Sequence, residues 1–165
     1  MLAVETAAFA TPAEAERVAA LLADPKARPT VSLLAEAHGV AVGHILLTGA
    51  RVSGDGATVA ASILAPLAVV PEAQRRGVGQ TLIHAGIAAL TALDVGLVFV
   101  LGHTDYYPRA GFRPALPLGL RPPYNIDPAV ADAWMVRATR PRLLGAVKGR
   151  VRCAKALMRP ELWRE

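Results

Sequence analysis

Residues 67–80 read Leu67-Ala68-Val69-Val70-Pro71-Glu72-Ala73-Gln74-Arg75-Arg76-Gly77-Val78-Gly79-Gln80. An apolar run leads into a short polar turn and then into a second apolar segment, which predicts a strand, a loop and a helix. Glycines in such a loop let a ligand approach the backbone without a Cβ in the way. Unpaired N–H groups at a helix start attract phosphate, and two arginines add positive charge there. The stretch therefore predicts a phosphate-binding loop.

Spacing separates three kinds of phosphate loop. A P-loop requires Lys followed by Ser or Thr after its last glycine, and neither pair follows Gly77 or Gly79. A dinucleotide fingerprint requires a third glycine where this chain has Leu82, although Asp94 is a loose match for its acidic residue. The pattern Q-x-x-G-x-G in residues 74–79 instead resembles the coenzyme A loop of the GNAT family of N-acetyltransferases. A glycine-containing helix start without a ligand is the alternative.

A second motif follows the next predicted strand, residues 95–101. Its sequence, Tyr107-Pro108-Arg109-Ala110-Gly111-Phe112, resembles the Y-x-x-x-G-F motif of the same family. The longer stretch 100–114, which contains this motif, resembles the YhbS-like branch of predicted acetyltransferases, as does the closing segment 144–163. With these, the resemblance extends from about residue 32 to the C-terminus. It implies an α/β GNAT (acyl-CoA N-acyltransferase) fold, with a mixed central sheet flanked by helices, and acetyl-CoA as co-substrate.

The resemblance also implies roles for individual residues. Tyr107 matches the tyrosine that protonates the departing thiolate, and a core tyrosine with a hydrogen-bonded hydroxyl is the alternative. The neighbouring Tyr106 should point elsewhere. The main-chain N–H of Val69 is the expected oxyanion donor, on a strand that binds the pantetheine arm. The implied cofactor-binding residues are Leu67, Ala68, Val69, Gln74, Arg75, Arg76, Gly77, Val78, Gly79 and Gln80.

Acetyl transfer to an amine also requires a base, because a free primary amine has a pKa of about 10. His103 and Asp105 follow the predicted strand 95–101, at the end where ligands bind in open α/β sheets. His103 is the candidate base because imidazole titrates near neutrality, and a loop histidine that holds a backbone carbonyl is the alternative. His44 falls within a predicted strand and is interpreted as structural. The histidines and the single cysteine lack metal-site spacing, so no metal is expected.

Length and composition fit one enzyme domain. The chain has 165 residues, 53% of them apolar, yet no apolar run approaches the roughly 20 residues of a membrane span. The lone Cys153 excludes an internal disulfide, and the N-terminus lacks the basic region of a secretory signal. We therefore expect a cytoplasmic protein that acts on a small-molecule or peptide amine, without a membrane partner.

The net charge of +5 is concentrated at the C-terminus. Residues 137–165 carry nine basic and two acidic side chains, whereas residues 1–136 carry nine basic and eleven acidic ones. We expect an acetyltransferase domain at residues 1–138 and a basic tail at residues 139–165 that packs on the domain or extends it. Nucleic acid is not the expected partner, because no stacking platform or nucleic-acid motif accompanies these charges.

Patterns along the rest of the chain predict the remaining elements. Residues 2–23 predict two helices, the second beginning at a capping box, Thr11-Pro12-Ala13-Glu14. A helix is expected at residues 77–93, and a proline-rich loop at residues 113–130 is expected to border the acceptor pocket. Besides residues 95–101, strands are expected at residues 30–36, 40–48 and 57–70, with a last strand at residues 131–138. Turns are expected at His38-Gly39 and Gly54-Asp55-Gly56.

Two features bear on the sheet and on function. Pro66 lies inside the predicted strand 57–70 and predicts a bulge or splay, because proline cannot donate a ladder hydrogen bond. The strand that usually opens a GNAT domain is missing from the sequence pattern. An exposed sheet edge would invite pairing with a second copy of the chain in a homodimer. The alternative function is a catalytically inactive GNAT-like protein that binds coenzyme A as a sensor or scaffold.

Overall fold

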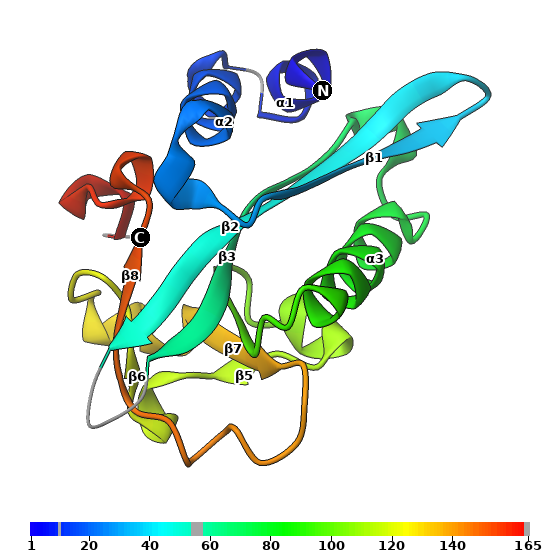
Figure 1. Ribbon diagram of the computed structural model, residues 1–165. Helices are drawn as coiled ribbons and strands as arrows, with labels where there is room; N and C mark the ends of the chain where they lie inside the picture. Colours follow the sequence, from blue (N-terminus) through cyan, green and yellow to red (C-terminus); the bar gives the residue numbers. More distant parts are fainter. Residues whose placement is uncertain (10, 54–57, 164–165) are drawn as a thin grey trace.

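The computed structural model describes residues 1–9, 11–53 and 58–163. A mixed sheet forms its centre, with helices on both faces (Figure 1). The strands follow the order β5-β7-β4-β3-β2-β8-β6, and β1 pairs with the first part of β2. The helices are α1 (Leu2–Phe9), α2 (Ala13–Ala23) and α3 (Val78–Ala92). The strands are β1 (Val31–Ala37), β2 (Val40–Ser53), β3 (Val59–Val69), β4 (Leu97–Leu101), β5 (Arg113–Pro114), β6 (Leu120–Arg121), β7 (Trp134–Ala138) and β8 (Gly149–Cys153).

The helices cover opposite faces of the sheet, and the side chains of β2 divide between them. Leu46 and Val52 belong to the core cluster that includes α2, whereas Ile45 and Leu47 belong to the cluster beneath α3. This division follows from the two-residue period of a strand. The α1 helix lies beside α2, on the face away from α3 (Figure 1). No helix among the described residues is both long and apolar enough to cross a membrane.

Most of the predicted elements are confirmed with bounds within a few residues. The two N-terminal helices, the β1–β2 hairpin, β3, α3 and β4 all form where the sequence pattern places them. His38 and Gly39 adopt left-handed φ values of 52° and 77°, as a two-residue hairpin turn requires. The turn predicted at residues 54–56 lies outside the described residues.

The predicted capping box at the start of α2 is wrong. The N-cap residue is Pro12, whose side chain has no polar atom. The helix therefore begins one residue later than a cap at Thr11 requires. Glu14 contacts Arg17 one turn further on instead of reaching back toward the helix start.

The strands β3 and β4 diverge, as Pro66 predicts. Among the described residues, their parallel pairing is confined to residues 61–63 of β3 and 97–99 of β4. Pro66 lies at a bulge, where the pairing of β3 with β2 shifts register between Ile45 and Leu47. Beyond the bulge β3 stays paired with β2 but no longer follows β4. The resulting splay opens at the end of β3 that leads toward α3.

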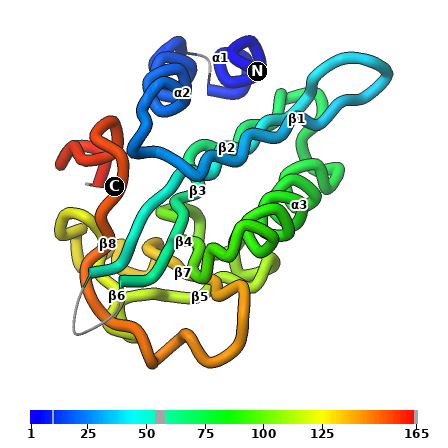
Figure 2. Tube along the Cα trace, viewed as in Figure 1, coloured from blue at the N-terminus to red at the C-terminus, as the bar shows by residue number. Residues whose placement is uncertain are grey.

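The predicted strand 131–138 forms as β7 but is not the last strand. β8 pairs antiparallel with β2 and parallel with β6, and its Val151 is buried. Further on, Trp163 packs edge to face on Trp134 at 5.4 Å, and Trp134 stacks on Phe99 at 5.0 Å. The C-terminal turns lie beside α2 (Figure 2). The basic C-terminal segment thus supplies a strand of the sheet and a core aromatic side chain.

Cys153 in β8 offers a test of how firmly this segment is held. Burial raises the pKa of its thiol to about 12, and the charge of Arg152 offsets only part of that rise. A raised pKa keeps the thiol protonated at neutral pH, whereas the thiolate is the reactive form. We expect iodoacetamide at pH 8 to label native Cys153 at least about 100-fold more slowly than the unfolded chain, measured by mass spectrometry. Comparable rates would show that β8 is not held in the sheet.

Candidate active site

The splay between β3 and β4 opens into a cavity of about 650 Å³. Its walls come from the end of β3, the loop that leads into α3, the first turn of α3 and the segment after β4. The lining residues are Leu67, Val69, Ala73, Gln74, Arg75, Gly77, Val78, Gly79, Gln80, His103, Tyr106, Tyr107 and Arg109. The two sequence motifs, separate in the chain, therefore meet across one cavity.

Two of the predicted cofactor-binding residues, Ala68 and Arg76, lie outside the cavity lining. Ala68 is fully buried and pairs with His44 of β2. The two-residue period of the strand turns its side chain away from the face that Leu67 and Val69 share. Arg76 is exposed on the loop beyond the cavity wall.

The end of β3 presents backbone groups to the cavity. The N–H of Val70 donates to the C=O of Val42 in β2 at 2.9 Å. Hydrogen bonding alternates along an antiparallel strand, so Val69 turns its own N–H and C=O toward the opposite edge, into the splay. The side-chain amide of Gln74 donates to this C=O at 3.0 Å. The N–H of Val69 is left facing the cavity.

The loop that follows delivers the start of α3 to the same cavity. Arg75 and Gly77 adopt left-handed φ values of 63° and 82°, and Gly77 is the N-cap. The first hydrogen bond of the helix runs from the N–H of Thr81 to the C=O of Gly77, at 3.0 Å. The N–H groups of residues 78–80 therefore have no acceptor within the helix. With the positive end of the helix dipole and the Arg75 side chain, they form a site for an anionic group such as a pyrophosphate.

Tyr107 forms part of the wall contributed by the segment after β4. It begins the 3-10 turn Tyr107–Ala110, and its ring packs edge to face on Phe112 at 5.8 Å. The side chain is buried. Burial, with a smaller contribution from Tyr106, raises the pKa of Tyr107 well above its usual value of about 10. Its hydroxyl is therefore protonated throughout the neutral range.

Tyr106 also lines the cavity, although it was expected to point elsewhere. Its hydroxyl stands over the helix start, since a Cβ added to Gly79 would lie 2.0 Å from Tyr106 Oη. Burial raises the pKa of Tyr106, while the charge of Arg109 and a hydrogen bond with Gln80 lower it. Consecutive side chains in a 3-10 turn are about 120° apart, so a concave site can take both tyrosines. The adjacent pair Tyr106-Tyr107 was the only sequence signal for this arrangement.

His103 lies in the cavity wall just after β4, with an exposed side chain. Its C=O accepts the N–H groups of Tyr106 and Tyr107 at 3.2 and 3.3 Å, so its backbone holds the turn that carries both tyrosines. The imidazole is thus brought to the cavity, whereas Asp105 lies outside the lining. Within the described residues, no group of three His, Cys, Asp or Glu side chains is arranged to hold a metal.

The proline-rich segment 113–130 lines a second, smaller cavity of about 300 Å³. Arg121 and Arg150 contribute to its wall, and Arg150 donates to the C=O of Pro122 at 2.8 Å. This cavity shares no lining residue with the larger one. The segment expected to border the acceptor pocket therefore does not border the cavity at the splay.

Comparison with known proteins shows which family has this architecture. Residues 2–112 match the family model described as the acetyltransferase (GNAT) family. The chain is 47% identical over 152 residues to the uncharacterized N-acetyltransferase YjhQ of Escherichia coli (strain K12). The aligned region covers 92% of this chain and 83% of YjhQ. The chain belongs to the GNAT family of N-acetyltransferases.

Solved structures agree with this assignment. The GNAT family N-acetyltransferase YhbS from Escherichia coli, in complex with CoA, matches with a TM-score of 0.83 at 26% identity. The match covers 96% of this chain and 84% of the YhbS chain. A GNAT family acetyltransferase from Brucella melitensis, in complex with acetyl-CoA, matches with a TM-score of 0.70 at 29% identity, over 93% and 86% of the two chains. The first of these neighbours therefore binds coenzyme A and the second binds acetyl-CoA, its acetyl thioester.

Replacing Gly79 by Ala tests the fit of Tyr106 against the helix start. The new Cβ would displace the Tyr106 hydroxyl and narrow the approach to the first N–H groups of α3. We expect the Kd of acetyl-CoA, measured by calorimetry, to rise about 10-fold, which corresponds to about 1.4 kcal/mol.

The matched control is Gly86→Ala on the same helix. A Cβ at Gly86 would meet Leu47 Cδ1 at 2.5 Å, so this change also crowds a buried glycine but lies away from the cavity. It should lower the melting temperature without changing the Kd of acetyl-CoA. An equal rise of Kd in both variants would contradict a local role for Gly79.

Proposed function

We propose that this chain is an acetyl-CoA-dependent N-acetyltransferase that moves an acetyl group directly to a small-molecule or peptide amine. The observation that carries the proposal is the meeting, in one cavity, of an anion-binding helix start, a strand edge with an exposed N–H and a buried tyrosine. The complexes of YhbS with CoA and of the Brucella enzyme with acetyl-CoA support the choice of cofactor.

The residues of the cavity divide the binding of acetyl-CoA between them. We assign its pyrophosphate to the N–H groups of residues 78–80, with Arg75 beside them. The pantetheine arm is assigned to the apolar edge formed by Leu67 and Val69, where the splayed strand can offer main-chain hydrogen bonds. When bound, acetyl-CoA supplies an activated acetyl thioester.

The same cavity contains groups for each requirement of the transfer. The N–H of Val69 is proposed to polarise the thioester carbonyl and to stabilise the oxyanion that forms when the amine attacks. Tyr107, protonated at neutral pH because burial raises its pKa, is proposed to donate its proton to the leaving thiolate. His103, at the exposed side of the wall, is the proposed acceptor of the amine proton.

The experiment is an acetyl-transfer assay on the full chain. Acetyl-CoA is incubated with amines of four classes: polyamines, aminoglycosides, peptides with a free N-terminus and peptides with a lysine side chain. Thiol release and the mass of each amine are measured together. Acetylated product in step with thiol release supports the proposal. Tight acetyl-CoA binding without product from any class would instead support an inactive coenzyme A sensor or scaffold.

A further inference from the structure

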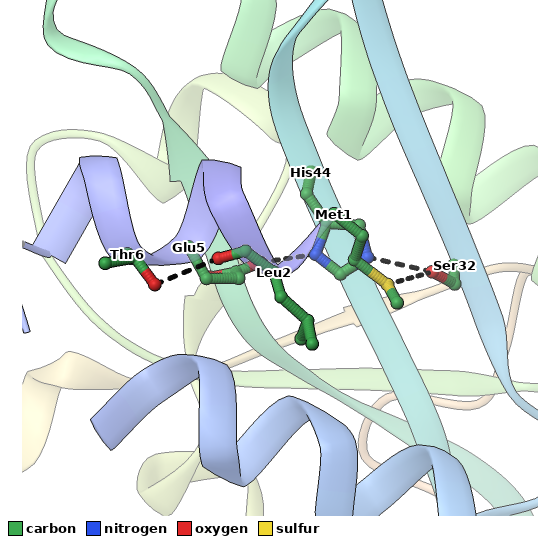
Figure 3. A network of polar contacts seen from close by, with 6 residues as sticks. All are labelled: Met1, Leu2, Glu5, Thr6, Ser32 and His44. Carbon is green, nitrogen blue, oxygen red and sulfur yellow. Dashed lines mark hydrogen bonds and ion pairs between the residues drawn. The ribbon is translucent and has the colours of Figure 1, made fainter. Parts of the chain in front are cut away.

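A second cluster of reactive side chains lies on the sheet face away from α3. It joins Glu5 of α1, Ser32 of β1 and His44 of β2 (Figure 3). The ring of His44 lies between the other two side chains: its Nε2 is 2.8 Å from Ser32 Oγ, and its Nδ1 contacts Glu5 Oε1. Glu5 and His44 are fully buried, whereas Ser32 is exposed. None of the three lines the acetyl-transfer cavity.

The hydroxyl of Ser32 has two acceptors in reach, His44 Nε2 at 2.8 Å and Met1 Sδ at 3.5 Å (Figure 3). The imidazole nitrogen is both nearer and the stronger acceptor. When Ser32 donates to Nε2, the remaining proton of His44 sits on Nδ1 and is donated to Glu5. This is the order of a nucleophile, its base and the carboxylate that orients the base.

Stability does not explain why Glu5 and His44 are buried together. Removing two ionisable groups from water costs more than burying an apolar pair of similar size. In addition, Glu5 Oε2 has no hydrogen-bond partner among the described residues, which adds a further cost. A buried carboxylate is useful where positive charge develops beside it, as it would on His44 after accepting a proton from Ser32.

The position of Ser32 also leaves its backbone available. The C=O of Val42 accepts a hydrogen bond from the residue that follows β3. Because the backbone groups of successive residues in β2 face β3 and β1 in turn, the N–H and C=O of Ile45 face β1, where Leu33 is the partner of Ile45. Ser32 and Leu34 then turn their N–H groups to the other edge of β1, which pairs only with β2 among the described residues. The Ser32 N–H can therefore donate to the oxyanion that forms on a substrate's carbonyl oxygen when the Ser32 hydroxyl attacks the carbonyl carbon.

We propose that Ser32, His44 and Glu5 form a second reactive site, in which Ser32 is a nucleophile toward small activated esters and thioesters. Ser32 Oγ attacks the carbonyl carbon while its proton passes to His44 Nε2. That proton goes to the leaving alkoxide or thiolate, which leaves an acyl ester on Ser32. Water, deprotonated by His44, then attacks the acyl carbon; the bond to Oγ breaks, Ser32 regains a proton from His44, and a carboxylic acid is released.

A fluorophosphonate probe tests this site on the full chain, because an activated serine displaces its fluoride and keeps the phosphonyl group. The chain has three serines, Ser32, Ser53 and Ser62. Ser53 is exposed in β2 and serves as an internal control, whereas Ser62 is buried. We expect peptide mass spectrometry to show labelling of Ser32 at least about 100-fold faster than of Ser53. Labelling of the two serines at similar rates overturns the proposal.

Variants separate the relay from simple exposure. His44→Gln and Glu5→Gln should each slow labelling of Ser32, the former by about 100-fold or more. Ser32→Ala should remove the fast label and leave acetyl-CoA binding unchanged, since Ser32 lies outside that cavity. Circular dichroism establishes that each variant is folded, and unchanged labelling in folded His44→Gln also overturns the proposal. If that variant does not fold, the ratio of Ser32 to Ser53 in the unaltered chain decides alone.

Discussion

Replacing Tyr107 by Phe is expected to lower the kcat of acetyl transfer by about 100-fold or more while the Kd of acetyl-CoA changes by less than about threefold. The change removes the proposed proton donor to the thiolate. It keeps the ring that packs on Phe112, so the fold should persist. Steady-state kinetics with the best amine, together with calorimetric titration of acetyl-CoA, separate the two quantities.

Tyr106→Phe is the matched comparison. The Tyr106 hydroxyl stands over Gly79 at the cofactor loop, so its loss should affect the Kd of acetyl-CoA more than kcat. The pH profile adds a second check. Because the pKa of Tyr107 is raised, its hydroxyl stays protonated as pH rises, so no loss of rate from this group is expected below about pH 10. A large loss of kcat in Tyr106→Phe alone would instead make Tyr106, and not Tyr107, the proton donor to the thiolate.

Replacing Gly77 by Glu is expected to raise the Kd of acetyl-CoA by at least about 100-fold. A Cβ on Gly77 would point into open space at the mouth of the loop, where it meets no atom within 4 Å. The added carboxylate would lie close to the N–H groups of residues 78–80. It would compete for them and repel the phosphates of the cofactor. Isothermal titration calorimetry measures the effect.

Two controls separate charge from backbone strain. Gly145 has the same left-handed conformation, with φ of 88° and open space around its Cβ position, but lies outside the cavity. Gly145→Glu should therefore leave acetyl-CoA binding intact. Gly77→Ala retains the backbone strain without the charge and should weaken binding much less than Gly77→Glu. If Gly145→Glu weakens binding as strongly, the effect is on the fold and not on the loop.

The local patterns in the sequence predict much of the fold and of the site. The motif at residues 74–79 predicts the loop and the helix start, because both features depend only on residues that are adjacent in the sequence. Pro66 likewise predicts the splay, since the missing N–H acts at its own position in the ladder. The cavity forms where these two local features meet.

What the sequence patterns miss depends on contacts between distant segments. β8 was not predicted, since Val151 becomes a core residue only when β2 and β6 lie on either side of the strand. The contact of Tyr106 with the helix start depends on how the turn after β4 meets α3. The contact of His44 with Glu5 spans 39 positions, and no spacing rule connects them. The capping box failed for a different reason: α2 begins at Ala13 with Pro12 as its N-cap, so Thr11 stands one residue too early to cap the helix.

Calorimetric titration of the unaltered chain with acetyl-CoA shows directly whether the cavity at the splay binds the cofactor. We expect one site per chain with a Kd in the micromolar range, about −8 kcal/mol, because the helix start, the strand edge and the cavity are already assembled in the folded chain. A folded chain that shows no binding up to millimolar acetyl-CoA would contradict this expectation.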